Sequence, residues 1–244
     1  MSAPLPYLPL DMGWPHLAAI ALIFGLWGFY TPILRIIGRG SLNSQLHDVR
    51  LRWLQMHQGI HREHRVFDAI LLGHISNSIS YFGSATLLVL AGLVGSLVNV
   101  ARIYQVTRDL SFFDPGMTAE SFTLCFALLT LIMALCFFAF TYALRKMSYT
   151  FALLGGLQAS PAHSDETRIM GEQAAIVLTE AVRSINNGIR GFYYAIAALF
   201  LFSGPYVCIA ATLVITAILY YRQMLSPTAR AIATYVAALK RLGP

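Results

Sequence analysis

Two long stretches without formal charge constrain this chain more than any other feature. Residues 69–101 contain no Asp, Glu, Lys or Arg, and residues 191–221 contain none either. A bilayer core about 30 Å thick requires roughly 20 apolar residues in helical form, at about 1.5 Å per residue. Each stretch is therefore long enough to cross a membrane. Apolar runs at 14–34 and 121–144 complete a set of four predicted spans.

The composition agrees with a membrane protein. Hydrophobic residues make up 57% of the 244 residues, charged residues only 11%, and the mean hydropathy is +0.63. A soluble domain carries about 25% charged residues. We therefore predict a single all-α, polytopic membrane domain over 1–244. It contains four transmembrane helices, two of which are long enough to kink, and interfacial helices. The net charge of +6 indicates basic segments facing anionic lipid rather than nucleic acid.

The placement of charge predicts the orientation. Residues 35–66 hold six Arg residues against two acidic residues, whereas 102–120 holds two Arg residues against three acidic ones. Because short basic connections stay in the cytoplasm, we expect 35–66 and 145–190 inside and the N-terminus outside.

The basic tail conflicts with four simple crossings, which would leave it outside. Ser203-Gly204-Pro205 interrupts the last apolar stretch, and Pro and Gly both weaken a helix. A re-entrant hairpin would return the tail to the cytoplasm, but its arms of roughly 13–16 residues are too short to cross alone. We therefore favour one kinked, tilted span over 191–221. Residues 228–242 predict an amphipathic helix that lies on a membrane surface or against a neighbouring subunit.

A weak internal repeat appears at an offset of 110 residues. Residues 31–35 align with 141–145, and several positions between 75 and 85 align with positions between 185 and 195. The pattern is consistent with two helical hairpins in parallel orientation. Apolar sequences also produce such matches by chance.

Several short runs near these positions resemble a known family. They are 77–84, 144–149 and 187–195, together with Arg52-Trp53 and Tyr221-Arg222. From about Gly25 to Ser226 the chain resembles the membrane family filed as domain of unknown function 599. The resemblance implies a four-helix protein of the bacterial inner (cytoplasmic) membrane, with no established activity.

A cluster of histidines lies outside that resemblance. His57, His61 and His64 are spaced i, i+4 and i+7, which places them on one face of a helix. Histidines at this spacing can share a zinc or other transition ion, with His74 or Glu63 contributing. A solvated interfacial helix is the alternative that we favour, and haem ligation is a third. We expect no cofactor.

A polar stripe on the second span is the main candidate site. Polar side chains in hydrocarbon are costly unless they meet partners or water. The stripe is therefore interfacial, bonds helices together, or lines a pathway for a solute or ion. The fourth apolar stretch opens with similar residues. The set is His74, Asn77, Ser80, Tyr81, Ser84, Asn187 and Arg190.

Charged residues next to these spans predict a cytoplasmic entrance. Arg65 and Asp68 are three residues apart and would form a clamp where the second span begins, with Arg145 or Arg190 as a further partner. The same Arg side chains would also suit phospholipid headgroups.

The sequence contains no nucleophile elbow, P-loop or zinc-protease motif, so we expect no enzyme activity. Three classes of function remain. We favour a homo-oligomeric channel or small-solute pathway. The first alternative is a non-catalytic accessory or scaffold subunit of a larger membrane complex, and the second is metal or haem binding through the clustered histidines. The expected partners are anionic lipids and other membrane subunits.

Overall fold

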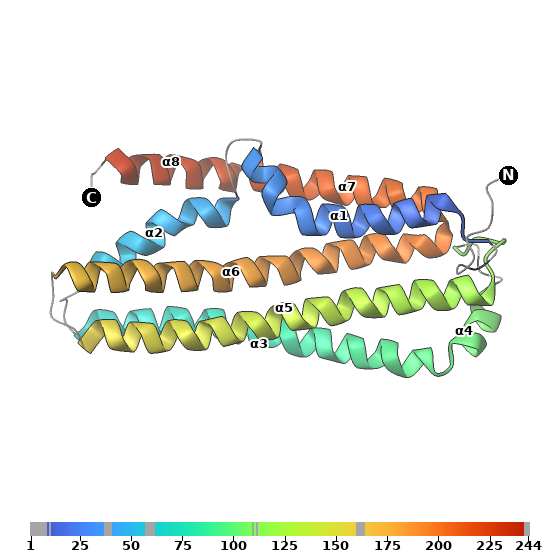
Figure 1. Ribbon diagram of the computed structural model, residues 1–244, viewed down its shortest axis with the longest axis horizontal. Helices are drawn as coiled ribbons and strands as arrows, with labels where there is room; N and C mark the ends of the chain where they lie inside the picture. The colour runs from blue at the N-terminus through green and yellow to red at the C-terminus, as the bar shows by residue number, and fades with distance from the viewer. Residues whose placement is uncertain are drawn as a thin grey trace. The chain divides into compact units, whose positions relative to one another are not determined.

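The computed structural model describes residues 9, 11–36, 41–56, 62–108, 110, 112–159 and 164–241. This part of the chain is helical and contains no strand. Figure 1 labels the elements along the chain. They are α1 (Trp14–Ile36), α2 (Leu42–Met56), α3 (Arg62–Leu97), α4 (Val100–Thr107), α5 (Ala119–Ala159), α6 (Asp165–Leu199), the 3-10 turn η1 (Phe200–Ser203), α7 (Pro205–Met224) and α8 (Pro227–Arg241).

Within the described residues, four segments are long and apolar enough to cross a membrane, which confirms an all-α polytopic membrane protein. They are Trp14–Leu34, Val66–Leu97, Ala119–Leu157 and Pro205–Arg241. The second segment begins before the predicted apolar run at 69–101, and the third extends past both ends of the predicted run at 121–144. The fourth starts at Pro205, inside the run over which we expected one continuous span.

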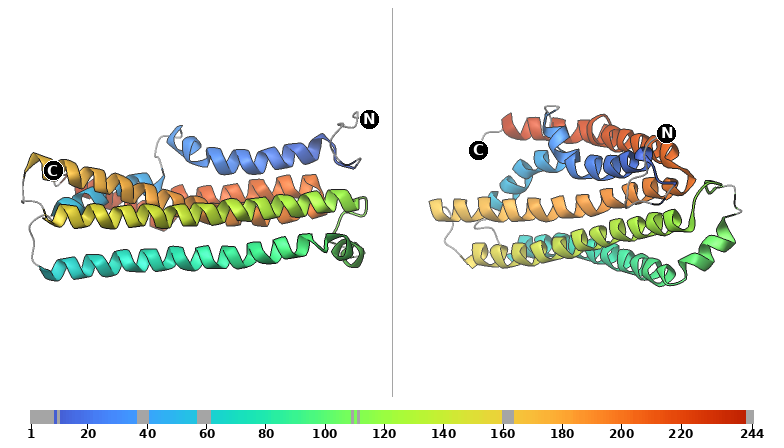
Figure 2. Two further views of the ribbon diagram at one scale, coloured as in Figure 1. Left: turned by 60° about the horizontal axis from the view of Figure 1, so that its bottom comes forward. Right: turned by 45° about the vertical axis from the view of Figure 1, so that its right-hand side comes forward.

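The expected kinked span over 191–221 is instead two antiparallel helices. Tyr194 and Thr216 approach with hydroxyl oxygens 3.1 Å apart, and the Cys208 thiol donates to the Ala197 carbonyl at 3.4 Å. In each pair, one residue precedes the turn at 200–204 and the other follows it. The chain therefore reverses direction at this turn. Figures 1 and 2 show α7 running back from this turn in the direction opposite to α6.

The reversal depends on Gly204. Its φ of 115° lies in the region that residues with a Cβ rarely adopt. Pro205 then begins α7 with its fixed φ, at a position where a helix needs no amide donor. The arms of this hairpin are longer than the 13–16 residues expected from the sequence, because each arm extends past the apolar run at 191–221. The first arm belongs to the 35-residue α6, and the second is the 20-residue α7, about 30 Å long.

The chain divides into two compact units. Unit 1 comprises 1–32, 85–137 and 188–219, and unit 2 comprises 33–84, 138–187 and 220–244. Five helices, α1, α3, α5, α6 and α7, contribute residues to both. Unit 2 holds 14 of the 17 Lys and Arg residues and seven of the 11 acidic residues, so its net charge is +7, whereas that of unit 1 is −1.

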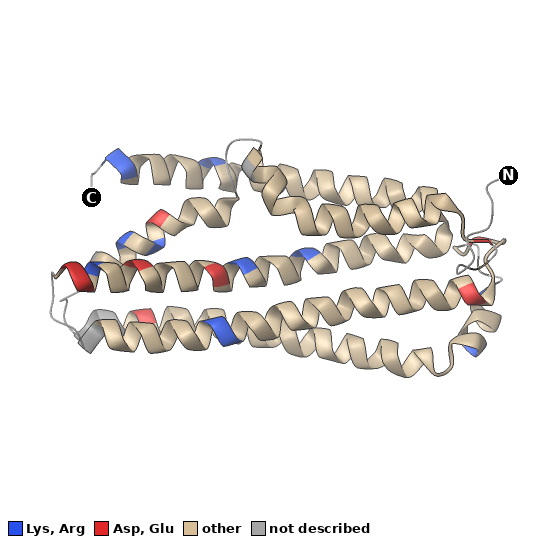
Figure 3. Cartoon of the chain, in the orientation of Figure 1, with Lys and Arg blue, Asp and Glu red and all other residues tan. Residues whose placement is uncertain are grey.

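The long helices exceed the thickness of a bilayer. Helix α5 has 41 residues, which corresponds to about 60 Å. Its charged residues leave an uncharged run from Ser121 to Leu144, about 36 Å long, which is part of the tan stretch of α5 in Figure 3. The residues after Leu144 therefore extend past the hydrocarbon.

The core of unit 1 depends on a close approach at Gly191 of α6. A Cβ built there would overlap the Cys136 sulfur of α5 and lie 2.7 Å from Cζ2 of Trp27 of α1. Both neighbours are buried, Cys136 completely and Trp27 to 6% exposure. The absence of a side chain at position 191 lets three helices meet at this point.

The core of unit 2 is built on small residues of α6. Ala174 and Ala175 are fully buried and pack against Leu54 of α2. On its other side α2 packs along α8. The Arg52 guanidinium donates to the Leu239 carbonyl at 3.0 Å, and Lys240 lies 3.1 Å from the Asp48 carboxylate. The tail predicted over 228–242 thus forms a helix that packs on α2.

We predict that Gly191→Ala destabilises the protein by about 1–3 kcal/mol, because the new methyl group forces a rigid indole out of place. Gly155→Ala is the matched control, since a Cβ at Gly155 meets nothing within 4 Å. Thermal unfolding of both variants in detergent measures the difference. Equal stability of the two variants would show that the three helices do not meet as described.

Candidate functional site

The polar stripe of α3 faces away from the chain's own core. His74, Asn77, Ser80 and Ser84 are exposed, and Tyr81 is 71% exposed. The buried positions of the same helix segment are Leu72, Ile79, Gly83 and Thr86, which lie on the other side of α3. Among the described residues of one chain, the stripe therefore neither bonds α3 to another helix nor lines an internal pathway.

Serine hydroxyls beside the stripe are satisfied by the helix itself. Ser78 donates to the His74 carbonyl at 2.9 Å, and Ser80 donates to the Ser76 carbonyl at 3.0 Å. Such bonds to the residue four positions earlier reduce the cost of placing a hydroxyl in lipid.

Ring packing within unit 2 indicates how deep the stripe lies. Phe82 of α3 stacks on Phe140 of α5 with ring centres 5.7 Å apart. The two helices are antiparallel (Figure 1), so moving from Phe140 to Arg145 on α5 corresponds to moving from Phe82 back to Asn77 on α3. His74 and Asn77 thus lie near the level of Arg145, a basic residue of α5.

Small residues continue along α3 in unit 1. Ala91, Gly92 and Gly95 are all exposed, and a Cβ at either glycine would meet nothing within 4 Å. The steps from Ser84 to Leu88, Ala91 and Gly95 are four, three and four residues, so these positions continue the helical phase of the stripe. We call Leu88, Ala91, Gly92 and Gly95 the small-residue face.

Arg190 is not part of this stripe. Its Nη1 donates to Oγ1 of Thr31 at 3.2 Å, and its guanidinium lies 4.9 Å from the ring centre of Tyr30. Both partners belong to α1, so Arg190 ties α6 to α1 within unit 1. Asn187, three residues earlier on α6, is half-buried.

Arg145 and the adjacent Lys146 have tyrosine neighbours on α5. The Arg145 Nε donates to the Tyr149 hydroxyl at 2.6 Å, and Lys146 lies 4.5 Å from the ring centre of Tyr142. Lys146 also donates to the Ser184 hydroxyl of α6 at 3.0 Å. Basic residues paired with tyrosines are typical of the membrane–water interface.

Asp68 binds a partner that sequence reasoning missed. The indole Nε1 of Trp53 in α2 donates to its carboxylate at 3.1 Å, which joins α2 to α3. The side chain of Arg65, the expected partner, lies outside the described residues. His57, His61 and the side chain of His64 also lie outside them, so the metal hypothesis does too. Within the described ranges, no group of three His, Cys, Asp or Glu residues could hold a metal ion.

The sequence analysis also did not predict a polar junction between α2 and α6. Asn43, His47 and Arg50 are spaced i, i+4 and i+7, a pattern that identifies one face of α2. Their side chains converge on Thr179 of α6, at 3.1 Å to its carbonyl from Asn43 and at 3.0 and 3.2 Å to its hydroxyl from His47 and Arg50. Burial lowers the pKa of the Arg50 guanidinium. These bonds fix how α2 lies on α6.

Asp11 caps the start of α5 in unit 1. Its carboxylate accepts hydrogen bonds from the Thr118 amide at 3.0 Å, the Thr118 hydroxyl at 2.9 Å and the Ser121 hydroxyl at 2.6 Å. Burial acts to raise the pKa of Asp11, but the hydrogen bonds from Ser121 and Thr118 outweigh it and hold this pKa below its usual value. The negative charge also suits a helix N-terminus.

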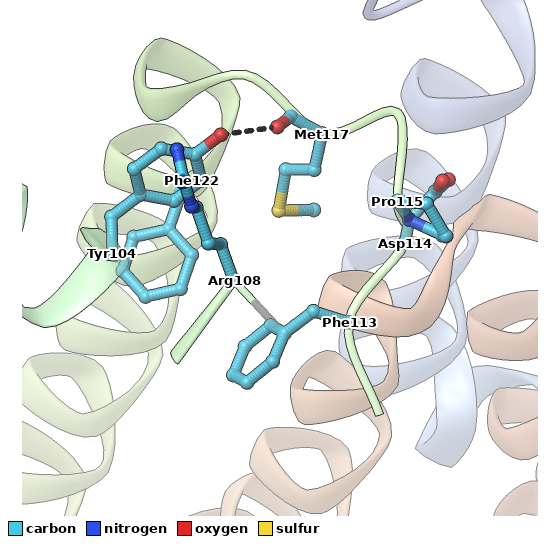
Figure 4. A pocket seen from close by; sticks show the side chains of 7 residues that line it. All are labelled: Tyr104, Arg108, Phe113, Asp114, Pro115, Met117 and Phe122. Carbon is cyan, nitrogen blue, oxygen red and sulfur yellow. Dashed lines mark hydrogen bonds between the residues drawn. The ribbon is translucent and has the colours of Figure 1, made fainter. Parts of the chain in front are cut away.

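A cavity of about 330 Å³ lies between α4 and the start of α5, also in unit 1. Two of its lining residues are hydrogen-bonded to each other, because the Tyr104 hydroxyl donates to the Met117 carbonyl at 2.8 Å (Figure 4). Phe113 packs against Phe122 and Phe202 at 5.7 and 5.9 Å between ring centres. The lining residues are Tyr104, Arg108, Phe113, Asp114, Pro115, Met117 and Phe122.

Comparison with known proteins identifies the family. The family profile described as "Protein of unknown function, DUF599" matches residues 18–228. The chain belongs to this family. The resemblance expected over Gly25–Ser226 is thereby confirmed. No curated protein matches this DUF599 chain, and no solved structure does either.

We predict that Asp11→Asn destabilises the protein by about 1 kcal/mol at pH 7, because the α5 cap loses its charge. The folded pKa of Asp11 is lowered, so its contribution is complete above the usual value of 3.8 and disappears as the pH falls through the lower folded value. Thermal midpoints of wild type and variant should therefore converge in strong acid. The control Glu120→Gln removes an exposed charge from the same turn, and an equal loss in that variant would contradict the specific role of Asp11.

Proposed function

We propose that this DUF599 protein is a non-catalytic, homo-oligomeric membrane scaffold whose copies associate through α3. The exposure of the stripe and of the small-residue face along one helix carries this proposal. In the scaffold, the basic unit 2 lies on the cytoplasmic side of a bacterial inner membrane, in contact with anionic lipid, and the N-terminus lies outside.

The small-residue face supports association between helices. Close contact in lipid depends on residues such as Gly, Ala and Ser, which let two backbones approach. Gly92 and Gly95 have open space where a Cβ would stand, and Ala91 is exposed between Leu88 and these glycines. A second copy offers the same small residues, so the face is complementary to itself.

The polar stripe supports the same arrangement. Ser84 lies two residues past Phe82, on the hydrocarbon side of the level of Arg145. A neighbouring copy would cover Ser80 and Ser84 and supply partners that lipid lacks. His74 and Asn77 lie nearer the water and need no such cover.

A pathway between copies is the second candidate, and the exposed polar half of α3 favours it. His74, Asn77 and Ser84 would form a polar vestibule between paired helices. The positions that continue this phase are Leu88, Ala91 and Gly95, which offer neither charge nor a polar side chain. A path through this second half would be dry, so we rank the scaffold above the pathway.

We predict that a cysteine at Ala91 forms a disulfide-linked dimer in oxidised membranes, because facing small residues bring the Cα atoms within about 7 Å. Val89→Cys is the matched control, since Val89 is 46% exposed and lies two residues away on a different side of α3. The three native cysteines are buried and should give a monomer background. Equal cross-linking at both positions, or none at Ala91, would overturn the proposed face.

Asn77→Leu separates the two candidates. It should leave cross-linking at Ala91 intact, because it removes an amide near the membrane surface and keeps the small-residue face. Wild-type flux of ions or small solutes into proteoliposomes that falls in this variant would establish the pathway. The scaffold predicts no flux above protein-free vesicles for either protein.

A further inference from the structure

One side of α5 changes from aromatic to basic near the end of its uncharged run, within unit 2. The exposed residues of this side follow one another at steps of four, three and four residues, so they share one helical face. They are Phe138, Tyr142, Arg145 and Tyr149. Phe140 and Met147 of the same segment are buried and lie on the opposite side. We call the four exposed residues the α5 outer face.

Arg145 is the first charged residue after the uncharged run at 121–144, which is about 36 Å long as a helix. A bilayer core is about 30 Å thick, so the first charge after such a run is expected at the level of the lipid headgroups. Phe138 precedes Arg145 by seven residues, or about 10 Å along the helix. The face therefore offers a cation to a headgroup and an aromatic ring to the acyl chain below it.

A tyrosine orients the guanidinium of Arg145. Its Nε donates to the Tyr149 hydroxyl at 2.6 Å, and its Cζ lies 5.8 Å from the ring centre of Tyr149. Among the described residues, the Arg145 side chain makes no other hydrogen bond, so the donors of its two Nη groups are available. Such paired donors match the oxygens of a phosphate group.

The charge of Arg145 is not neutralised by the described part of the chain. No described carboxylate oxygen lies within 4 Å of its side-chain nitrogens. The adjacent Lys146 differs, because it lies 3.8 Å from the Glu180 carboxylate of α6 and donates to the Ser184 hydroxyl. Glu180 also pairs with Arg183 at 2.5 Å. Lys146 thus joins two helices, whereas Arg145 leaves a positive charge on the outside of α5.

The geometry points to a site for one anionic phospholipid on the α5 outer face, with its phosphate on the Nη groups of Arg145 and an acyl chain along Tyr142 and Phe138. Inorganic phosphate would leave the aromatic part of the face uncovered, and a lipid without net charge would leave the cation unbalanced. The site lies on a different helix from the association face of α3. It shares with the proposed function only the placement of unit 2 at the cytoplasmic surface, where anionic lipids attract basic residues.

Native mass spectrometry of the full-length protein in a neutral detergent, titrated with phosphatidylglycerol, tests the site. We expect saturable binding of one lipid per chain. Phosphatidylcholine with the same acyl chains should bind more weakly, because it carries no net charge. Arg145→Gln should weaken phosphatidylglycerol binding about fivefold or more, and Arg230→Gln less than about twofold. Arg230 is the matched control, since it is an exposed cation of α8 in the same unit and outside the face.

Further variants separate loss of the site from loss of the fold. Circular dichroism and the thermal midpoint show whether Arg145→Gln folds as wild type does. Arg145→Lys keeps the charge without the paired donors and should bind with intermediate affinity, which provides a second variant if the first is unstable. Tyr149→Phe removes the acceptor that orients Nε, and it should weaken phosphatidylglycerol binding less than Arg145→Gln does, without changing phosphatidylcholine binding.

Three results would overturn the proposal. They are absence of saturable binding, equal affinity of wild type for the two lipids, and equal losses in the Arg145 and Arg230 variants. The lipid site and the scaffold fail separately, because lipid is counted per chain and association is read from cross-linking at Ala91→Cys. Phosphatidylglycerol bound through Arg145 in protein that does not cross-link would support the site and overturn the scaffold alone.

Discussion

The mismatch between helix length and bilayer thickness controls the structure of this protein. A hydrocarbon core about 30 Å thick accommodates roughly 20 helical residues, whereas α3, α5 and α6 have 36, 41 and 35. Each is therefore longer than the lipid core is thick, and α3 and α5, which contain candidate membrane segments, must continue beyond the lipid. The continuation needs polar contacts of its own, which unit 2 supplies through Trp53–Asp68, Lys146–Ser184 and the side chains around Thr179.

The turn at Gly204 has consequences for the whole chain. Because α6 and α7 are antiparallel, the end of α7 belongs to the same unit as the start of α6, and the basic tail joins the other basic segments in unit 2. The conflict between the tail and the positive-inside rule therefore disappears. Figure 3 shows blue and red positions in the first part of α6 and only tan in its last part. Arg190 is the last charged residue of this helix.

Hydropathy alone predicted the helical membrane class and the apolar parts of α1, α3 and α5. It failed where apolar composition continued through a reversal, because Leu201 and Phe202 are as apolar as the helices on either side of the turn. The glycine and proline at 204–205 marked the break but not its angle, which depends on contacts such as Tyr194 with Thr216.

The sequence predicted part of the candidate site. Helical spacing placed His74, Asn77 and Ser84 on one face, but only burial shows that this face points away from the core. Arg190 was grouped with the stripe by its sequence neighbours, whereas its bond to Thr31 joins residues 159 positions apart. The cavity around Arg108 carries no sequence signature, since part of its lining comes from the loop before α5, which is hydrogen-bonded to η1.

Labelling of single cysteines in intact cells tests most directly whether the basic unit 2 lies in the cytoplasm. Glu166 and Ala119 are exposed positions in units 2 and 1, respectively. With an impermeant maleimide, Ala119→Cys should react in intact cells, and Glu166→Cys should react only after the membrane is permeabilised. Reaction of Glu166→Cys in intact cells, with protection of Ala119→Cys, would contradict the account.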